Sequence, residues 1–396
     1  MDFGHGMLAY WALDPAVTYL NHGTVGAVPK RVLAAAQAIR EEIERQPSRL
    51  LLREVSGLVG GPRTEPTRMR VAAGAVARFI GARGSDVVFV DNATTGVNAV
   101  LRSIRVEPGD ELLLTDHNYG ATARVAAFVA RERRAHVRTV MVPYPAFDPG
   151  RLVEDVARAI GPRTRVAVID HITSESALIF PLEEIVRACR TRGVPVLVDG
   201  AHAPGVLPLD VPALGVDWYV ANLHKWAHAP RSSGFLWADP GRQADLHPPV
   251  ISWGLDQGFS AEFDWVGTRD PSPWLASPEG LRFLDDLGFD RARRYNHALA
   301  WHAATMLCDR WRTTPAADEP CIGAMATVAL PDRLGADAQS AARLRDALLF
   351  DDRIEVQVHA GHGRLWTRIS AQVYNELSDF ERLGEAVERY ATHRAW

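Results

Sequence analysis

The sequence predicts an α/β fold in which a large, mostly parallel mixed sheet is joined to a smaller α+β lobe. Two observations support this prediction. Short apolar runs alternate with helical segments up to about residue 240, as expected for a sheet that helices cover on both faces. After about residue 276 the pattern changes to helix, helix, strand, helix, two strands and helix, which is typical of a smaller α+β lobe.

The elements follow in chain order. A first helix is predicted from about Pro29 to about Gln46, where apolar residues recur at helical spacing. A loop with Gly57, Gly60, Gly61 and Pro62 comes next. The predicted strands are apolar runs: Val87–Val90, Leu112–Leu114, Val137–Val142, Val166–Ile169, Val194–Val198 and Phe235–Trp237. The predicted helices between them lie at about 95–105, 120–133, 150–160 and 181–192.

The segment from about residue 243 to residue 275 has a different composition. It is rich in Pro, Gly, Trp and Phe and lacks periodicity, which indicates a long loop or an interface segment. Its residues Trp253, Trp265 and Trp274 could line a pocket, or they could belong to the core or to a dimer interface. We place a large domain at residues 18–265 and a small domain at 1–17 together with 266–396.

The composition excludes several classes of function. The 44 basic and 48 acidic residues give a net charge of −4, which disfavours nucleic-acid binding. Cys189, Cys308 and Cys321 form no CxxC motif or Cys/His cluster, so we expect neither a disulfide framework nor a metal site. No run of about 18 apolar residues predicts a membrane span, and residues 1–10 lack the basic start of a signal peptide. We expect a cytoplasmic enzyme that acts on a small molecule.

The most informative residues are Asp199, directly after the run Val196–Val198, and Lys225, between His224 and Trp226. A carboxylate at a buried strand end needs a cation or hydrogen bonds, and an apolar pocket lowers the pKa of a lysine, which makes it a nucleophile. Pyridoxal phosphate requires a lysine for a Schiff base and an aspartate for its pyridinium nitrogen. Each residue alone also fits a turn cap or a solvated lysine, so only the combination supports this hypothesis.

Further motifs occur in a characteristic order over about residues 18–240: Tyr19–Gly26, Asn92–Asn98, Asp199–Gly205, Gly215–Tyr219, His224–Trp226 and Ser233–Phe235. With them, the sequence resembles the class V aminotransferase family of pyridoxal-phosphate enzymes (fold type I), and within it the isopenicillin N epimerase-like proteins. The small lobe matches mainly around Arg368. The resemblance implies pyridoxal 5'-phosphate as cofactor and a homodimer with shared active sites.

The resemblance also implies roles around the cofactor ring. Lys225 would form the Schiff base and then act as the base that moves the α-proton. Asp199 would keep the ring nitrogen protonated, and His202 would hydrogen-bond the phenolic oxygen. His117 would stack on the outer face of the ring, with Tyr119 as an acid on the same side. For His117 and Tyr119, ordinary loop polarity is an equally good explanation.

Other residues would hold the phosphate group. Thr94 and Thr95 lie between a predicted strand and a helix, where N–H groups and the helix dipole attract anions. By resemblance, Asn222 and His224 are further phosphate ligands. Thr268, in the irregular segment, resembles a residue that reaches the phosphate of a neighbouring subunit.

The remaining residues would bind the substrate. In relatives, the arginine that matches Arg368 holds the α-carboxylate through two hydrogen bonds, a geometry that lysine cannot supply. The alternative for Arg368 is a salt bridge at a strand edge. Asn21, His22 and Gly23 resemble the N-terminal loop that closes over the substrate.

One departure from the family is informative. A cysteine desulfurase needs a mobile cysteine shortly before the carboxylate-binding arginine, and the stretch Val358–Arg364 contains none. Desulfurase activity is therefore disfavoured. His359 and His362 lie in this stretch, but two histidines without a third ligand indicate a polar loop and not a metal site.

We therefore predict an enzyme that labilises the Cα–H bond of an amino-acid substrate, as an epimerase or racemase does. An aminotransferase and a C–S lyase of the same family remain alternatives, because these reactions begin with the same proton removal. A protein that keeps the fold without catalysis is disfavoured. Epimerisation needs a second acid besides Lys225, and Tyr119 and His117 are the candidates.

Overall fold

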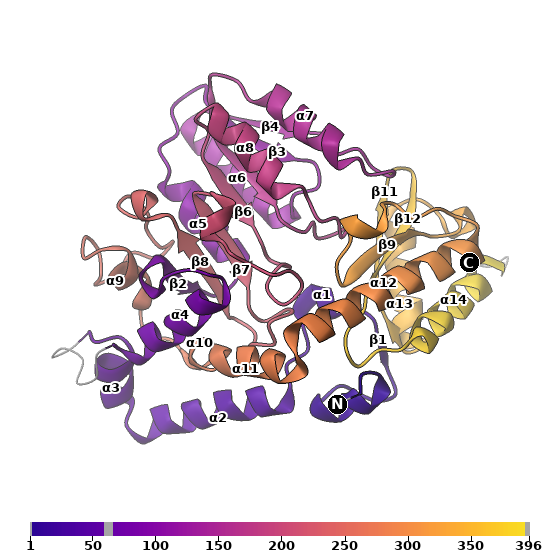
Figure 1. The fold of residues 1–396 in the computed structure, drawn as a ribbon, viewed down its shortest axis with the longest axis horizontal. Helices are drawn as coiled ribbons and strands as arrows, with labels where there is room; N and C mark the ends of the chain where they lie inside the picture. Colours follow the sequence, from indigo (N-terminus) through magenta and orange to yellow (C-terminus); the bar gives the residue numbers. More distant parts are fainter. Residues whose placement is uncertain (1, 59–65, 393–396) are drawn as a thin grey trace.

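The structure is a computed structural model that describes residues 2–58 and 66–392. Its larger sheet has the strand order β2–β8–β7–β6–β5–β3–β4 (Figure 1). The strands are β2 (Val87–Val90), β3 (Glu111–Thr115), β4 (His136–Val140), β5 (Thr164–Asp170), β6 (Val196–Asp199), β7 (Trp218–Asn222) and β8 (Gly234–Ala238). Only β8 runs antiparallel to its neighbours β2 and β7. The predicted mixed sheet is confirmed.

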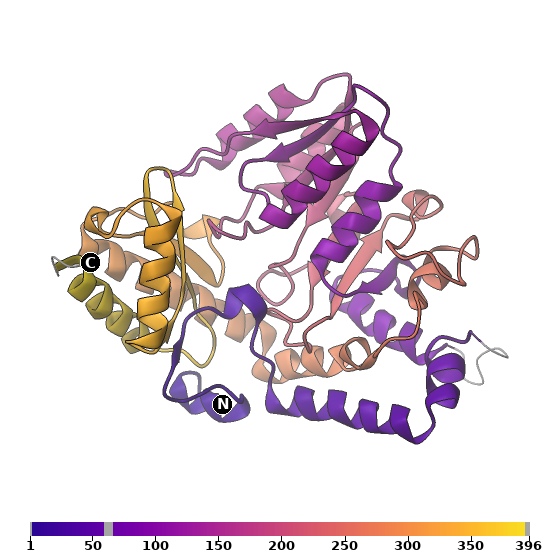
Figure 2. The same cartoon turned by 180° about the vertical axis from the view of Figure 1, so that it is seen from behind.

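Helices cover both faces of this sheet (Figures 1 and 2). On one face, α5 (Ala93–Ser103) packs against α6 (Gly120–Arg133) and against β7 and β8. The other face is covered by α4 (Arg68–Phe79), α7 (Pro149–Ala159) and α8 (Leu182–Thr191). These elements agree with the predicted helices except for α4.

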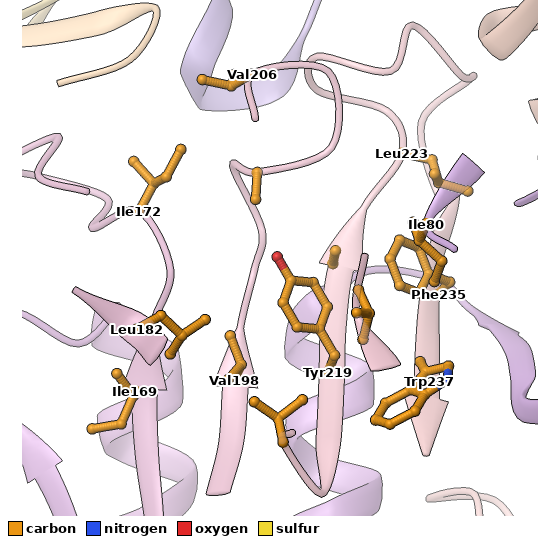
Figure 3. Close-up of a cluster of buried hydrophobic side chains, with 14 of the residues drawn as sticks. Ile80, Ile169, Ile172, Leu182, Val198, Val206, Tyr219, Leu223, Phe235 and Trp237 are labelled. Carbon is orange, nitrogen blue, oxygen red and sulfur yellow. The ribbon is translucent and has the colours of Figure 1, made fainter. Parts of the chain in front are cut away.

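The strands contribute side chains to the hydrophobic clusters on both faces of the sheet, because successive side chains of a strand point to opposite faces. Val198 of β6 joins the hydrophobic cluster beneath α7 and α8, whereas its neighbour Leu197 joins the one beneath α5 and α6. Figure 3 shows part of the first cluster, where side chains of β5 to β8 lie side by side, among them Ile169, Val198, Tyr219 and Phe235. Strands buried in this way explain the near-continuous apolar runs in the sequence.

The C-terminal elements form the smaller lobe, which is built around a three-stranded antiparallel sheet of order β11–β12–β9. They are α12 (Phe289–Trp311), β9 (Met325–Ala329), α13 (Ala338–Phe350), β10 (Ile354–Glu355), β11 (Gln357–Gly361), β12 (Arg364–Ser370) and α14 (Leu377–Thr392). This order confirms the predicted α+β pattern. The short strand β1 (Thr18–Tyr19) pairs in parallel with β10, which ties the start of the chain to this lobe.

The remaining helices lie on the larger lobe, apart from α1, which lies between the two lobes (Figure 1). They are α1 (His22–Val25), α2 (Lys30–Arg45), α3 (Pro47–Arg49), α9 (Phe259–Asp264), α10 (Ser272–Leu275) and α11 (Ser277–Leu287). Both α10 and α11 pack against α2 and α4, on the larger lobe. The domain division at residues 265 and 266 stays a prediction. In the described ranges, no helix combines the length and apolarity needed to cross a membrane.

The structure differs from the sequence predictions in three places. The strand β7 and the helix α4 were not predicted, and the 243–275 segment contains α9 and α10 as well as loops. The buried residues of α4 do recur at helical spacing, but three of the five are alanine, so its apolar face is a weak signal in the sequence. Trp274 is buried and stacks on Phe89, whereas Trp253 is 75% exposed. In the predicted glycine loop, Gly60, Gly61 and Pro62 lie outside the described residues.

Candidate active site

A cavity of about 200 Å³ lies at the carboxyl ends of the parallel strands, where α/β sheets bind ligands. Half of the predicted site residues line it: Thr94, Tyr119, Asp199, His202, Asn222, His224 and Lys225. They come from the ends of β6 and β7 and from the segments that follow β2, β3, β6 and β7. The sheet thus brings together residues that lie far apart in the sequence.

Asp199 ends β6 and is buried. Thr122 Oγ1 donates a hydrogen bond to Asp199 Oδ2 at 3.0 Å, and the N–H of Ala201 donates to Oδ1 at 3.1 Å. Burial raises the pKa of Asp199. The residue that follows must be glycine, because a Cβ on Gly200 would lie 2.3 Å from the ring of Tyr219.

A second aspartate, Asp170, was missed by the sequence reasoning. It ends β5 directly beside Asp199 in the sheet, lines the same cavity, and accepts a hydrogen bond from Asn118 Nδ2. Burial and the neighbouring charge of Asp199 raise the pKa of Asp170 well above its ordinary value. The pair therefore favours one negative charge over two. The signal was present in the sequence, since the predicted strands Val166–Ile169 and Val194–Val198 are each followed directly by an aspartate.

Lys225 and Lys30 are the two lysines of the sequence. Lys30 is exposed at the start of α2, whereas Lys225 lines the cavity with its Nζ 3.0 Å from His202 Nε2. Burial and the positive charge of Arg368 lower the pKa of Lys225 to about 7, against the opposing effect of Asp199. A large fraction of the amine is therefore neutral and nucleophilic at neutral pH.

His202 is buried, and burial lowers its pKa well below the ordinary value, so the ring is neutral. When Lys225 donates to Nε2, the single ring proton is assigned to Nδ1. Nδ1 is buried and has no hydrogen-bond partner among the described residues. Such a group is costly unless a ligand supplies an acceptor.

The start of α5 forms one wall of the cavity. Asn92 caps this helix by accepting from Thr95 N–H at 3.0 Å, and Asn222 Oδ1 accepts from Ala93 N–H at 2.8 Å. Thr94 lines the cavity at the positive end of the helix dipole, a position that suits a phosphate. His224 Nδ1 donates to the Ser233 carbonyl at 2.9 Å, and burial lowers its pKa to about 4.

Two predicted phosphate residues lie elsewhere. Thr95 and Thr268 line a separate apolar cavity of about 180 Å³ on which Lys225 does not border. Thr268 is exposed there. The structure of the single chain thus places Thr268 outside the cavity of Lys225, and its role toward a neighbouring subunit stays a prediction.

Arg368 lies on β12, and its guanidinium group is buried beside the first cavity. It donates to the Ser174 carbonyl and to Thr24 Oγ1, both at 2.6 Å, and to Asn21 Oδ1 at 3.3 Å. In the described part of the chain it forms no ion pair, so the strand-edge salt bridge is not observed. Burial lowers the pKa of Arg368 to about 10. A buried cation without a carboxylate partner is a site that favours an anion.

The predicted substrate loop is the short helix α1 with its flanks. Asn21 contacts Arg368, and Gly23 N–H donates to Ser370 Oγ at 3.2 Å. His22 is fully buried, lines neither cavity, and contacts the backbone of Lys225 instead. This position differs from the substrate-facing one that the sequence predicts.

A second cavity of about 360 Å³ adjoins the first and shares Tyr119 and Ser174 with it. His117 lines this second cavity, together with His359, His362, Tyr144 and Trp366. His117 Nδ1 lies 2.7 Å from Ser176 Oγ, and burial lowers the pKa of His117. The position next to the cofactor cavity suits the side chain of a substrate.

All three cysteines lie away from both cavities. Cys189 and Cys308 are buried in the two cores, and burial raises the pKa of each thiol. Within residues 2–58 and 66–392, no group of three His, Cys, Asp or Glu side chains could hold a metal ion. The site therefore offers a lysine, carboxylates and histidines for chemistry.

This fold, with a lysine and an aspartate facing one cavity, defines a pyridoxal-phosphate enzyme of fold type I. Residues 18–383 match the sequence model of the family described as aminotransferase class-V, and the chain belongs to that family. Its cofactor is pyridoxal 5'-phosphate.

Three similar proteins show the range of the family. Isopenicillin N epimerase from Streptomyces clavuligerus is 34% identical over 95% of this chain and 95% of the relative. The probable L-cysteine desulfhydrase, chloroplastic, of Arabidopsis thaliana is 33% identical over 94% of this chain and 83% of the relative. The apo structure of cysteine desulfurase from Thermococcus onnurineus NA1 aligns with a TM-score of 0.80 and 19% identity, covering 99% of this chain and 98% of that chain. At this identity the last comparison shows the fold alone.

The cavity fits the cofactor of the family. Asp199 has no cation at hydrogen-bond distance among the described residues, and a protonated ring nitrogen would supply one. His202 Nδ1 needs an acceptor, which an oxygen of the cofactor would provide. Thr94 and the start of α5 suit a phosphate group, and Lys225 is the lysine within reach.

Proposed function

We propose that the protein uses pyridoxal phosphate to remove and return the α-proton of an amino-acid substrate, and that its net reaction is epimerisation or racemisation. The observation that carries this proposal is the shared cavity of Lys225 and Tyr119, two proton-carrying groups from different segments, beside Arg368. The bound cofactor supplies an electron sink for the negative charge that forms at the α-carbon.

The residues of the chain have separate tasks in this proposal. Arg368 binds the α-carboxylate of the substrate. The carboxylate oxygens then accept the hydrogen bonds that the guanidinium group donates to Thr24 and Asn21 in the structure. Asp199 would keep the ring nitrogen of the bound cofactor protonated and positively charged. The raised pKa of Asp170 leaves Asp199 as the charged member of the aspartate pair. Lys225, with a pKa near 7, accepts the α-proton.

We assign the second proton donor to Tyr119. Its phenol carries an O–H group that can donate, and it lines both cavities. His117 is less suited, because Nδ1 is engaged by Ser176 and burial favours the neutral ring. The hydroxyls of Thr173 and Ser176 lie 2.7 Å apart and extend this series of hydrogen bonds. Every group has a partner when Thr173 donates to Ser176 and Ser176 donates to Nδ1 of His117. His117 then presents a neutral Nε2–H, which binds acceptors but is a weak acid.

A second candidate is β-elimination, a C–S lyase reaction. It is supported by the similarity to the desulfhydrase, which covers nearly the whole chain. Elimination begins with the same proton removal by Lys225 and differs in the bond that breaks next. Desulfurase activity is not supported, because neither cavity contains a cysteine.

We also propose a homodimer in which Thr268 completes the phosphate site of the partner. The support is the exposed apolar segment that lies next to the cavity of Thr95 and Thr268, including Val250, Ile251 and Trp253. A dimer buries such a patch. Light scattering measures the oligomeric state, and Thr268→Ala should weaken cofactor binding in a dimer. A monomer with full cofactor affinity would refute this part.

The decisive experiment is α-proton exchange in D2O across a panel of amino acids, followed by chiral analysis and assays for keto acid and ammonia. Exchange with inversion and no keto acid supports the epimerase. Keto acid with ammonia or a thiol indicates a lyase, and keto acid with loss of the lysine-bound cofactor indicates transamination. Lys225→Ala should abolish exchange. A protein that binds no cofactor at Lys225 would refute the whole proposal.

A further inference from the structure

The main chain of Lys225 is held by a buried histidine that the proposed mechanism does not use. His22, in α1, is 0% exposed. Its Nε2 lies 3.1 Å from the carbonyl oxygen of Lys225, and its Nδ1 lies 2.8 Å from the hydroxyl of Tyr374. Figure 1 shows α1 between the large sheet and the C-terminal lobe, so this contact joins three distant segments of the chain.

The two partners fix the direction of both hydrogen bonds. A carbonyl oxygen only accepts, so Nε2 of His22 carries the proton and donates to Lys225. Nδ1 is then the acceptor, and the phenol of Tyr374 donates to it. Burial lowers the pKa of His22 to about 4 and raises that of Tyr374, so both groups stay in these forms at neutral pH. Both ring nitrogens are occupied, which leaves none for a substrate.

A second contact of the same segment supports this arrangement. A Cβ on Gly26 would lie 2.0 Å from the carbonyl oxygen of His224 and 3.0 Å from Cα of Lys225. The chain after α1 therefore runs directly against the backbone that carries the lysine. The carbonyl oxygen of Gly26 also accepts a hydrogen bond from Arg231 at 3.0 Å. His22 and Gly26, at the two ends of α1, thus both contact the backbone of residues 224 and 225.

We infer that His22 is a positioning residue for Lys225: it holds the lysine backbone through Nε2–H while Tyr374 orients its ring. This inference rests on the proposed function, because it assigns His22 to proton transfer by Lys225 and not to substrate binding. A histidine that contacted the substrate would affect substrate affinity. A histidine that positions the base affects proton transfer and the environment of the lysine-bound cofactor.

The two amide side chains separate the two hydrogen bonds. In His22→Gln, the amide nitrogen takes the place of Nε2 and can still donate to the Lys225 carbonyl. In His22→Asn, the amide takes the place of Nδ1 and cannot reach that carbonyl. His228→Asn is the matched control, because His228 is also buried, its ring lies 5.9 Å from that of His22, and no described contact joins it to Lys225.

The measurements use the cofactor-loaded enzyme: kcat and KM for α-proton exchange, and the pH midpoint of the lysine-bound cofactor absorbance. His22→Asn should lower kcat about fivefold to tenfold, the effect of one hydrogen bond, and shift the absorbance midpoint with KM unchanged. His22→Gln and His228→Asn should stay within about twofold of the wild type. Tyr374→Phe should show a smaller loss of the same kind and replaces His22→Asn if that variant does not fold.

Two results would overturn the inference. One is a rise in KM with kcat unchanged in His22→Asn, which would make His22 a substrate contact. The other is equal behaviour of the Asn and Gln variants, or of Tyr374→Phe and the wild type. A wild-type protein without lysine-bound cofactor absorbance would instead refute the proposed function, so the two failures are distinguishable.

Discussion

The amine of Lys225 should titrate near neutral pH in the cofactor-free protein. Its ammonium form is disfavoured because burial removes water from the charge and because Arg368 adds a second positive charge to the same site. These effects lower the pKa from 10.5 to about 7. Two substitutions test the electrostatic part of this argument, Arg368→Gln and Asp199→Asn.

The size of the effect follows from the two pKa values. At pH 7, about half of the Lys225 amines are neutral, whereas an ordinary lysine is neutral in only about three molecules in ten thousand. The fraction of Lys225 amines that can react as a nucleophile should therefore exceed that of an exposed lysine by more than about a thousandfold at this pH. The same advantage applies to the bond that Lys225 forms with its cofactor.

The two substitutions shift the titration in opposite directions. Arg368→Gln removes a positive neighbour, so the ammonium form becomes less unfavourable and the pKa of Lys225 rises. Asp199→Asn removes a negative neighbour that favours the ammonium form, so the pKa of Lys225 falls. At pH values below the midpoint, each unit by which the pKa rises lowers the neutral fraction by about tenfold.

The assay is labelling with an amine-acylating reagent between pH 5 and pH 10, read by peptide mass spectrometry. The sequence contains only two lysines, so each labelled peptide is unambiguous, and exposed Lys30 reports the reactivity of the reagent itself. Labelling of Lys225 should rise with a midpoint near 7. A midpoint above about 9 would refute the reasoning, as would substitutions that shift it in the same direction.

Three further predictions concern binding, stability and stereochemistry. Arg368→Ala should raise KM for carboxylate-bearing substrates by the equivalent of ~2–4 kcal/mol, and an unchanged KM would remove Arg368 from the site. Gly200→Ala should lower the free energy of unfolding by ~1–3 kcal/mol, because its Cβ would meet Tyr219. Gly120→Ala, which meets no atom within 4 Å, should be neutral or stabilising in the same denaturation series. Tyr119→Phe should retain isotope exchange in D2O but lose inversion, and undiminished inversion would exclude Tyr119 as the second donor.

The alternation of apolar runs and helices was enough to predict most of the fold, because buried parallel strands must be apolar along their whole length. The strand β7 was missed although all its residues are buried. Its sequence, Trp218 to Asn222, contains only one β-branched residue, but Trp218 and Tyr219 also favour strands, so this short apolar run was present in the sequence and was overlooked. Tertiary contact with β6 and β8 decides its conformation.

The site could be predicted only where one residue type determines the chemistry. Lys225 and Asp199 belong to this class, since a cofactor of this kind needs an amine and a carboxylate. The role of Ser174 could not be read from the sequence, because it holds Arg368 through a backbone carbonyl that every residue possesses. Asp170 could have been noticed in the sequence, but its importance depends on the pairing register of β5 and β6, which places it beside Asp199.

The position of His22 shows why a motif does not determine a role. The stretch Asn21–His22–Gly23 resembles a substrate-closing loop, and Asn21 contacts Arg368, which we propose binds the carboxylate. On one turn of helix, adjacent side chains point in different directions, so Asn21 and His22 face different partners. Asn21 faces Arg368, and His22 faces the backbone of Lys225. The same turn therefore contacts both Arg368, the proposed anion site, and Lys225, the proposed base, so the two contacts can be separated only by substituting Asn21 and His22 one at a time.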